Sequence, residues 1–433
     1  MSLLTKNRKT ALDIKSQHLI LKRAIITILI TIVYIVLTEI PLPFIHLRPL
    51  VRLIENPNMQ SFQLLSMLGG GNLTQMSILL IGYMPYITCQ LFMQLLTLGL
   101  SPKLKALSES ANGQRHIGQL TKLATLPLAL IQSAITVEML QRITNYRLFG
   151  AAGIPNWVLV LTLTLIITAS TLIAVWLSDL NTIYGLGNGV NYLISCSIIV
   201  SMVETTKIQP KFIQHWCHVL GNRFWVYMAI AVVVFLIYNA ICIWYQSSTL
   251  KLKMQFAQLA SSVTHSGNLQ LPLNIANVMP VIFAGILMNL LYMLNIWHSR
   301  TLESLVSFKT WGSIGLYTFI LVIFTYIFTF VQYYPHKLND NIDRMNSIIV
   351  GVDPTLETIR FLRKSLIMLA SINVVFFIIM VTIPMILCKL SGMPETMVLS
   401  VSSVLIVITT EADIRRQIVG LRAKEIKTDL ISA

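Results

Sequence analysis

The sequence predicts an all-α membrane protein with ten transmembrane helices in two inverted five-helix halves. Of its 433 residues, 55% are apolar and only 11% are charged, and the mean hydropathy is +0.72. These values exclude a soluble globular protein. Apolar windows of about 20 residues, enough to cross about 30 Å of hydrocarbon, recur along the whole chain. The windows are 21–39, 74–98, 118–138, 156–178, 190–206, 224–245, 275–296, 312–334, 365–388 and 394–411.

The distribution of positive charge predicts that both termini are cytoplasmic. With that orientation, 22 of the 32 Lys and Arg residues fall in inner segments, as the positive-inside rule requires. The net charge of +15 is therefore mainly an orientation signal that also attracts anionic lipids. Direct nucleic-acid binding is the weaker interpretation. The basic N-terminus resembles a signal peptide, but no small-residue cleavage site follows it and nine further spans do, so a retained first span is expected.

The five cysteines predict neither a disulfide framework nor a metal site, because they are scattered and form no CxxC pair. They are expected to act as small apolar side chains. They are Cys89, Cys196, Cys217, Cys242 and Cys388.

Two halves of five spans must have opposite topology when both termini lie on one side. The predicted boundary is in the loop after the fifth span, which gives an N-terminal half of 1–205 and a C-terminal half of 206–433. No residue-level repeat between the halves is evident. The inner loops 246–274 and 335–364 are long enough to carry function, although a charged loop is usually only a solvated surface.

The second span carries a polar face in an otherwise apolar segment. Positions 83, 87, 90, 94 and 97 follow steps of four and three residues and so share one helical face. Pro85 should kink this helix, because it cannot bond to the carbonyl of Ile81. Buried glutamines often only bond to neighbouring helices. The alternative is a watery inner funnel that closes at an apolar constriction, which excludes ions by dewetting.

The near absence of ionisable residues deep in the spans argues against an ion-coupled transporter. A gated passive path is favoured. Upstream of the second span, residues 60–71 predict a short helix that ends in three glycines, either an interfacial helix or a movable stopper.

Two further segments suggest irregular helices. The GxGxG run in 184–194 is a poor nucleotide site, because no strand precedes it and no phosphate-binding lysine follows. Segment 277–291 repeats the design of the second span, with Pro280 early and Asn289 as a lone polar residue. These features indicate either an opening seam or simple packing kinks.

At these motifs the chain resembles the SecY family of protein-conducting channels. The matching segments occur in the family's order over nearly the whole chain. They are "GYMPYITCQLFMQLLT", "LSESANGQRHIGQLTKLATLPLALIQS", "YGLGNGVNYLI", "LPLNIANVMPVIFAGIL" and "TTEADIRRQI".

The resemblance implies a clamshell that passes unfolded preproteins across the plasma membrane and releases apolar helices sideways into lipid. The gate would run between spans two and three on one side and spans seven and eight on the other. The implied pore ring is Tyr83, Ile87, Val190, Ile194, Ile282 and Ile406. The implied plug includes Phe62, Leu65, Met67, Leu68, Gly69, Gly70 and Gly71. The polar lateral-gate residues would be Thr88, Gln94, Asn188 and Asn289.

This mechanism needs no catalytic residue, cofactor or metal ion, so the chain is not expected to be an enzyme. A SecA-type ATPase would supply the energy, since this chain has no Walker motif. Small SecE- or SecG-like, or accessory, membrane subunits are further implied partners. The implied motor-docking residues in the inner loops are Lys251, Lys253, Arg344, Asp353 and Arg360.

The inner loops depart from the family pattern. Segment 351–355 is GVDPT, with Asp353 where the family usually has an arginine, so a bidentate cationic contact is lost there. Loop 246–274 contains only two lysines and no arginine. These departures resemble the accessory SecY of some Gram-positive bacteria, which works with its own SecA and exports serine-rich glycosylated adhesins. The housekeeping SecY is the alternative, and a secondary transporter or flippase is a more distant one.

Overall fold

The computed structural model describes residues 2–44, 76–97, 111–143, 155–208, 224–256, 266–294, 310–344, 347–352, 356–391 and 395–431. The chain divides into two compact units. The first comprises Met1–Met93, Glu109–Phe224 and Ile406–Ala433, and the second comprises Gln94–Ser108 and Trp225–Leu405. The predicted division of the chain at residues 205 and 206 stays a prediction.

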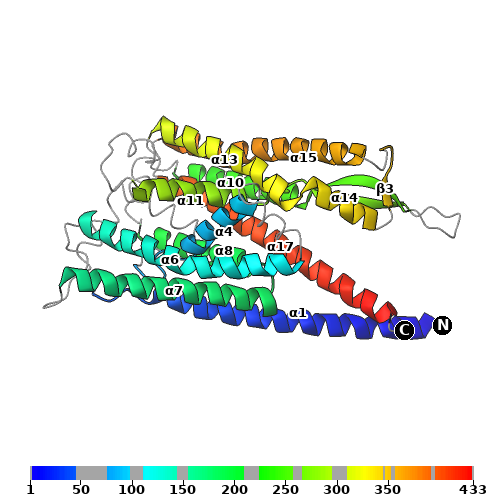
Figure 1. The fold of residues 1–433 in the computed structure, drawn as a ribbon, viewed down its shortest axis with the longest axis horizontal. Helices are drawn as coiled ribbons and strands as arrows, with labels where there is room; N and C mark the ends of the chain where they lie inside the picture. The colour runs from blue at the N-terminus through cyan, green and yellow to red at the C-terminus, as the bar shows by residue number, and fades with distance from the viewer. Residues whose placement is uncertain are drawn as a thin grey trace. The chain divides into compact units, whose positions relative to one another are not determined.

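The first unit is built from helices (Figure 1). They are α1 (Ser2–Glu39), most of α4 (Met84–Leu95), α6 (Ala111–Ile143), α7 (Asn156–Tyr184), α8 (Gly189–Ile208) and the later part of α17 (Glu395–Ile431). Helix α7 packs against α1, α6 and α8. Hydroxyl groups join α6 to α7, where Ser133 lies 3.0 Å from the Thr168 hydroxyl. Such bonds hold apolar helices together in lipid, where burial alone gives little net attraction between them.

The second unit combines helices with a small sheet. Its helices are α10 (Phe224–Ser247, whose first residue belongs to the first unit), α11 (Met279–Leu294), α13 (Trp311–Gln332), α14 (Pro335–Arg344), α15 (Leu356–Phe377), the π-helical turn η4 (Ile378–Thr382) and α16 (Ile383–Ser391). Aromatic stacking joins α11 to α13, with the Phe283 and Phe328 ring centroids 4.7 Å apart. The Tyr245 hydroxyl of α10 donates to Asn373 of α15 at 2.6 Å.

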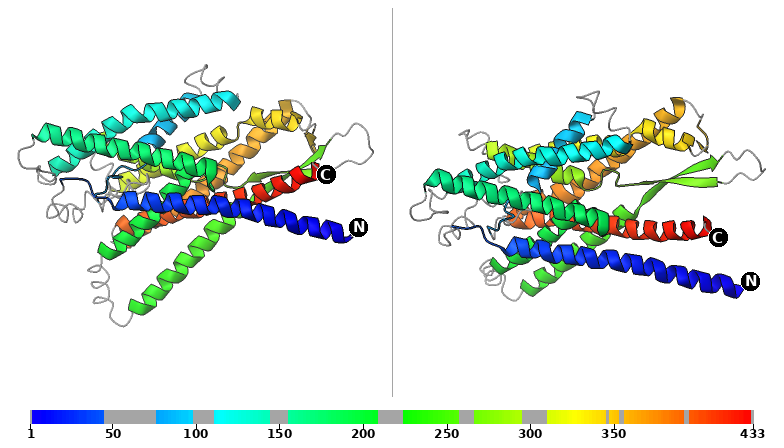
Figure 2. Two further views of the ribbon diagram at one scale, coloured as in Figure 1. Left: turned by 90° about the horizontal axis from the view of Figure 1, so that it is seen from below. Right: turned by 60° about the horizontal axis from the view of Figure 1, so that its bottom comes forward.

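The sheet corrects the all-α prediction. Strands β1 (Thr249–Phe256), β2 (Ser266–Pro272) and β3 (Ser347–Ile349) form an antiparallel sheet in the order β2-β1-β3. The cause is the strict alternation in β1, which places Met254 in a core with Ile342 and Leu362 while Lys251 and Lys253 stay exposed. The inner loops 246–274 and 335–364 are therefore partly ordered into one sheet, and Figure 2 shows its β1–β2 ribbon.

Every predicted span overlaps a helix in the described part of the chain. Five of these helices are long and apolar enough to cross a membrane: Ile20–Glu39, Gly113–Arg142, Asn156–Tyr184, Trp311–Gln332 and Glu357–Leu387. Gly189–Ser201, Val233–Ser247 and Met279–Leu291 are shorter apolar helices. The protein is thus a mostly helical, multi-pass membrane protein, while ten spans in two inverted halves stay a prediction.

The design shared by the second span and segment 277–291 extends to several matched residue types in helices α4 and α11. Both begin with Met-Pro, and alignment at that pair matches residue types further along each helix. The matched pairs are Met84 and Met279, Pro85 and Pro280, Ile87 and Ile282, Met93 and Met288, and Gln94 and Asn289. The match is short, and the arrangement of the chain in two inverted halves stays a prediction.

Candidate functional site

The start of α4 corrects the expected kink at Pro85. The helix begins at Met84, so Pro85 is its second residue. In the first turn a missing backbone N–H costs nothing, because that group would have no partner within the helix. Gly82, with a φ of 58°, turns the chain just before the helix. Pro85 therefore starts a helix rather than bending one, and Pro280 has the same position in α11.

Tyr83, a predicted ring residue, immediately precedes α4 and is fully buried. Its backbone carbonyl accepts the bond from Ile87 N at 3.0 Å. Its hydroxyl donates to the Ala174 carbonyl of α7 at 3.1 Å, and its ring stacks on Tyr34 of α1. The hydroxyl therefore has a partner on a neighbouring helix.

The rest of the polar face on α4 changes in burial along its length. Ile87 is buried, whereas Gln90, Gln94 and Thr97 are only partly buried. Thr97 donates to the Gln94 carbonyl at 2.8 Å. Burial therefore decreases from Ile87 toward Thr97, while the depth of this face in the membrane stays a prediction.

The predicted lateral-gate residues have different surroundings. Thr88 is buried and lies 3.4 Å from Gln132 Nε2, which joins α4 to α6. Asn289 is buried on α11. Asn188 is exposed, and its side chain accepts the Val190 N–H at 3.1 Å, the interaction of a helix N-cap. Asn188 thus has a structural role at the start of α8.

The remaining predicted ring residues lie on three helices. Ile194 of α8, Ile282 of α11 and Ile406 of α17 are each at most 1% exposed, and Val190 of α8 is partly buried. Ile282 belongs to the second unit, while the other ring residues belong to the first.

The GxGxG segment is a packing junction in this fold. The Leu186 N–H donates to the Thr27 hydroxyl of α1 at 2.9 Å, and the Gly189 N–H donates to the Thr182 hydroxyl of α7 at 2.9 Å. The Gly187 N–H donates to Gln417 of α17. Because these donors bond to the protein, they are not available to hold a phosphate, which agrees with the rejection of a nucleotide site.

A family model described as SecY matches residues 77–414. The chain belongs to the SecY family. It is 29% identical over 415 residues to the protein translocase subunit SecY of Streptococcus gordonii, with 93% of each chain covered. It is also 29% identical over 406 residues to the protein translocase subunit SecY 2 of Lactobacillus kefiranofaciens, covering 92% of this chain and 96% of the relative.

Solved structures support the SecY fold. A protein-conducting channel matches with a TM-score of 0.63 at 13% identity, covering 93% of both chains. A SecY channel studied for a plug domain that stabilises its closed state matches with a TM-score of 0.64 at 15% identity, again covering 93% of both. The chain is thus a channel subunit of a protein translocase and not an enzyme, which removes the transporter and flippase alternative.

Several predicted SecY elements lie outside the described residues. These are the plug at 60–71 and Asp353 in the inner loop. Among the other predicted docking residues, Lys251 and Lys253 of β1, Arg344 of α14 and Arg360 of α15 are all exposed.

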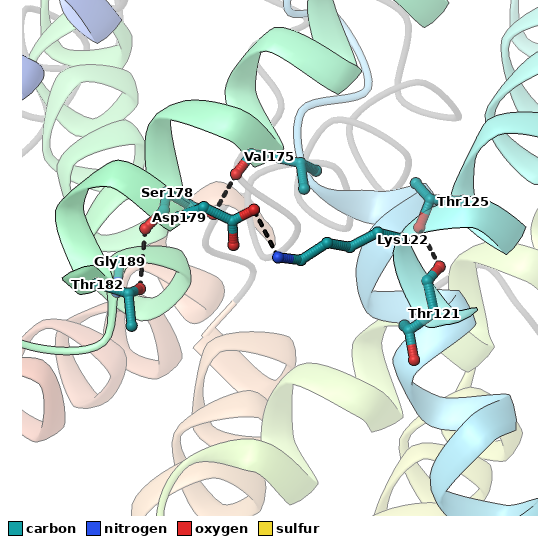
Figure 3. Close-up of polar contacts among 8 residues, drawn as sticks. All are labelled: Thr121, Lys122, Thr125, Val175, Ser178, Asp179, Thr182 and Gly189. Atoms are coloured by element: carbon teal, nitrogen blue, oxygen red, sulfur yellow. Dashed lines mark hydrogen bonds and ion pairs between the residues drawn. The ribbon is translucent and has the colours of Figure 1, made fainter. Parts of the chain in front are cut away.

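One ion pair was missed by the sequence analysis. Lys122 of α6 reaches Asp179 of α7, with Nζ 2.6 Å from Oδ2 (Figure 3). Both residues lie near the ends of predicted spans, so neither is a charge deep within a span. The sequence does carry a signal for this pair. Lys122 and Asp179 have opposite charges and lie near the inner ends of the third and fourth predicted spans, which are consecutive and antiparallel.

Proposed function

We propose that this SecY-family chain is the channel of an accessory Sec system, which translocates unfolded preproteins across the cytoplasmic membrane. Its preferred cargo would be large serine-rich glycosylated adhesins, and its motor would be a dedicated accessory SecA. Accessory or SecE- and SecG-like subunits would complete the complex, and both termini would be cytoplasmic.

The proposed pore ring is Tyr83, Ile87, Val190, Ile194, Ile282 and Ile406. The observation that carries the channel mechanism is the bond from the Tyr83 hydroxyl to Ala174 at 3.1 Å. A tyrosine in an apolar constriction would otherwise bring a free donor that attracts water. With that donor occupied, the aromatic ring can contribute an apolar surface, and a dry constriction can exclude ions without any charge.

In the proposed cycle, a signal helix enters at the gate beside Thr88, Gln94 and Asn289. The segment 60–71 moves away, and the ring widens around the extended chain. The local match of α4 and α11 supports this proposal, because it gives the two gate helices the same start and a polar residue at the same step along each helix.

The accessory assignment is supported by the surface of the cytoplasmic sheet. The three described strands contain only two basic side chains, Lys251 and Lys253, and no arginine. A ribosome or a housekeeping motor that binds through bidentate arginine contacts would have no arginine on these strands to bind. One relative is named SecY 2, and others of similar identity are named simply SecY.

Deletion of the gene separates the accessory from the housekeeping SecY. Loss of an accessory channel should leave growth intact and abolish export of one class of surface glycoprotein. Lethality would instead assign the housekeeping role. Copurification from native membranes then identifies the pathway, since the accessory proposal requires a SecA distinct from the one that serves general secretion.

A further inference from the structure

The glycine loop, residues 185–189 between α7 and α8, is held by side chains from three helices. From α1, Arg23 donates to the Gly185 carbonyl at 3.3 Å and Thr27 accepts from Leu186 N. From α7, Asn181 donates to the Leu186 carbonyl at 3.2 Å. The third helix is α17, through Gln417.

Three glycines of the loop lie too close to their neighbours to carry a side chain. A Cβ at Gly185 would overlap Asn181 and Thr27, and one at Gly189 would overlap the Ser178 carbonyl. Gly187 has a φ of +80°, and its Cβ would lie 2.9 Å from Ile414 of α17. Only glycine allows the backbones to approach this closely.

A second contact joins α8 to α17 at a later position in α8 and an earlier position in α17. The Ser195 and Thr410 hydroxyls are 2.7 Å apart, and Thr410 lies 3.4 Å from the Asn191 carbonyl. Thr410 and Gln417 are two helical turns apart on the same face of α17, a separation of about 10 Å along the axis. A single contact would let α17 pivot, whereas two contacts at that spacing fix its angle to α8.

We infer that the part of α17 from Ile406 onward moves as one body with α8 and the glycine loop during translocation, with Gln417 as the positioning residue. This inference rests on the proposed function. It means that Val190, Ile194 and Ile406, which form one side of the proposed ring, keep their positions relative to one another. This side of the ring is called the fixed wall. The ring must then widen through its other members.

A disulfide tests whether this wall separates. On a background with the five native cysteines replaced by alanine, Ser195→Cys and Thr410→Cys place two thiols where the hydroxyls now touch, a spacing that suits a disulfide. The oxidised channel should translocate a preprotein within about threefold of the reduced rate, a difference of under about 1 kcal/mol. Arrest on oxidation that reduction reverses would overturn the inference while leaving the proposed channel function intact.

The role of Gln417 is tested without preprotein. Spin labels at Ile199 of α8 and Val419 of α17, which are 48% and 62% exposed, report the spacing of the two helices. Gln417→Leu should broaden the distance distribution, because it removes the acceptor for Gly187 N. Gln417→Glu should preserve the distribution, because it keeps an acceptor.

The matched control is Arg415→Leu, two residues away on the same helix. Arg415 is exposed and pairs with Glu411 of its own helix, so its loss should leave the distances unchanged. An unchanged distance distribution in Gln417→Leu would overturn the inferred role of Gln417, whether or not the chain translocates protein.

The disulfide experiment has a further control in its reduced form. If the reduced channel with Ser195→Cys and Thr410→Cys fails to translocate although the cysteine-free background does, Ser195 and Thr410 have a role beyond holding α8 and α17 together, which also overturns the inference. If the native chain translocates nothing with its own motor, the proposed function fails.

Discussion

The Tyr83 hydroxyl donates a hydrogen bond to the backbone carbonyl of Ala174, at 3.1 Å. This bond crosses from the start of α4 to the middle of α7, and stacking on Tyr34 fixes the tyrosine ring from a third helix. The polar atom of the proposed ring is thereby turned to a protein acceptor. A hydroxyl group in an apolar constriction is thus compatible with a dry seal.

Substitution of Tyr83 should separate sealing from stability. Tyr83→Phe loses one hydrogen bond and should lower the free energy of unfolding by about 1 kcal/mol, with the membrane still tight to ions. Tyr83→Ala leaves a cavity, should cost about 3–5 kcal/mol, and should let ions through. Ion conductance of reconstituted vesicles measures the seal. Equal leakage from the two variants would contradict this account of the hydroxyl.

Crosslinking tests the ring itself. A cysteine or photo-crosslinker at Tyr83 or Ile282 should label a preprotein stalled in the channel, because both residues are proposed to surround the chain. Exposed positions on the outer helix faces, such as Leu29 of α1 and Leu161 of α7, serve as controls that should not label. Labelling at the controls alone would show that the ring is assigned to the wrong residues.

Two glycines should respond oppositely to the same substitution. Gly189→Ala drives a methyl group into the Ser178 carbonyl and should greatly reduce the yield of folded protein. Gly118→Ala adds a methyl group with nothing within 4 Å and should be neutral or stabilising by up to about 1 kcal/mol. Size-exclusion chromatography of detergent extracts compares them. Similar yields of both would mean that the glycine loop is looser than described.

The ion pair between Lys122 and Asp179 should contribute little but measurably. Both side chains are partly exposed, so Lys122→Met or Asp179→Asn should each cost at most about 1 kcal/mol. If the charges act through each other, the double variant should cost no more than either single one. The pair formed by Glu138 and Arg142 lies within α6 and is the control for a contact that joins no second helix. Additive losses from Lys122 and Asp179 would show that the two residues act independently.

Asp353 should help to determine which motor the channel accepts. Asp353→Arg restores a cation that can bind a carboxylate through two hydrogen bonds, and should strengthen binding of a housekeeping SecA. Asp353→Asn removes the acid without adding the cation and is the matched control. Binding of purified SecA to channel in nanodiscs measures the effect. Unchanged binding in Asp353→Arg would remove this position from motor selection.

The sequence by itself determined the membrane class, the positions of the apolar helices and the family. These follow from local properties, since a run of about 20 apolar residues has few stable states except a spanning helix. The strand at 249–256 could also have been predicted from the sequence, because its apolar and polar residues alternate with a period of two. It was missed because the segment was treated only as a loop between spans.

Only the tertiary structure decided what the unusual residues do. Pro85 looked like a kink until the start of α4 was placed at Met84, and helix boundaries depend on tertiary contacts as much as on sequence. The partners of Tyr83, Lys122 and Gly187 lie 91, 57 and 230 residues away along the chain. A pattern within one helix cannot specify such pairs, because the pairing depends on which helices pack together and on how far each is displaced along its axis relative to its neighbour.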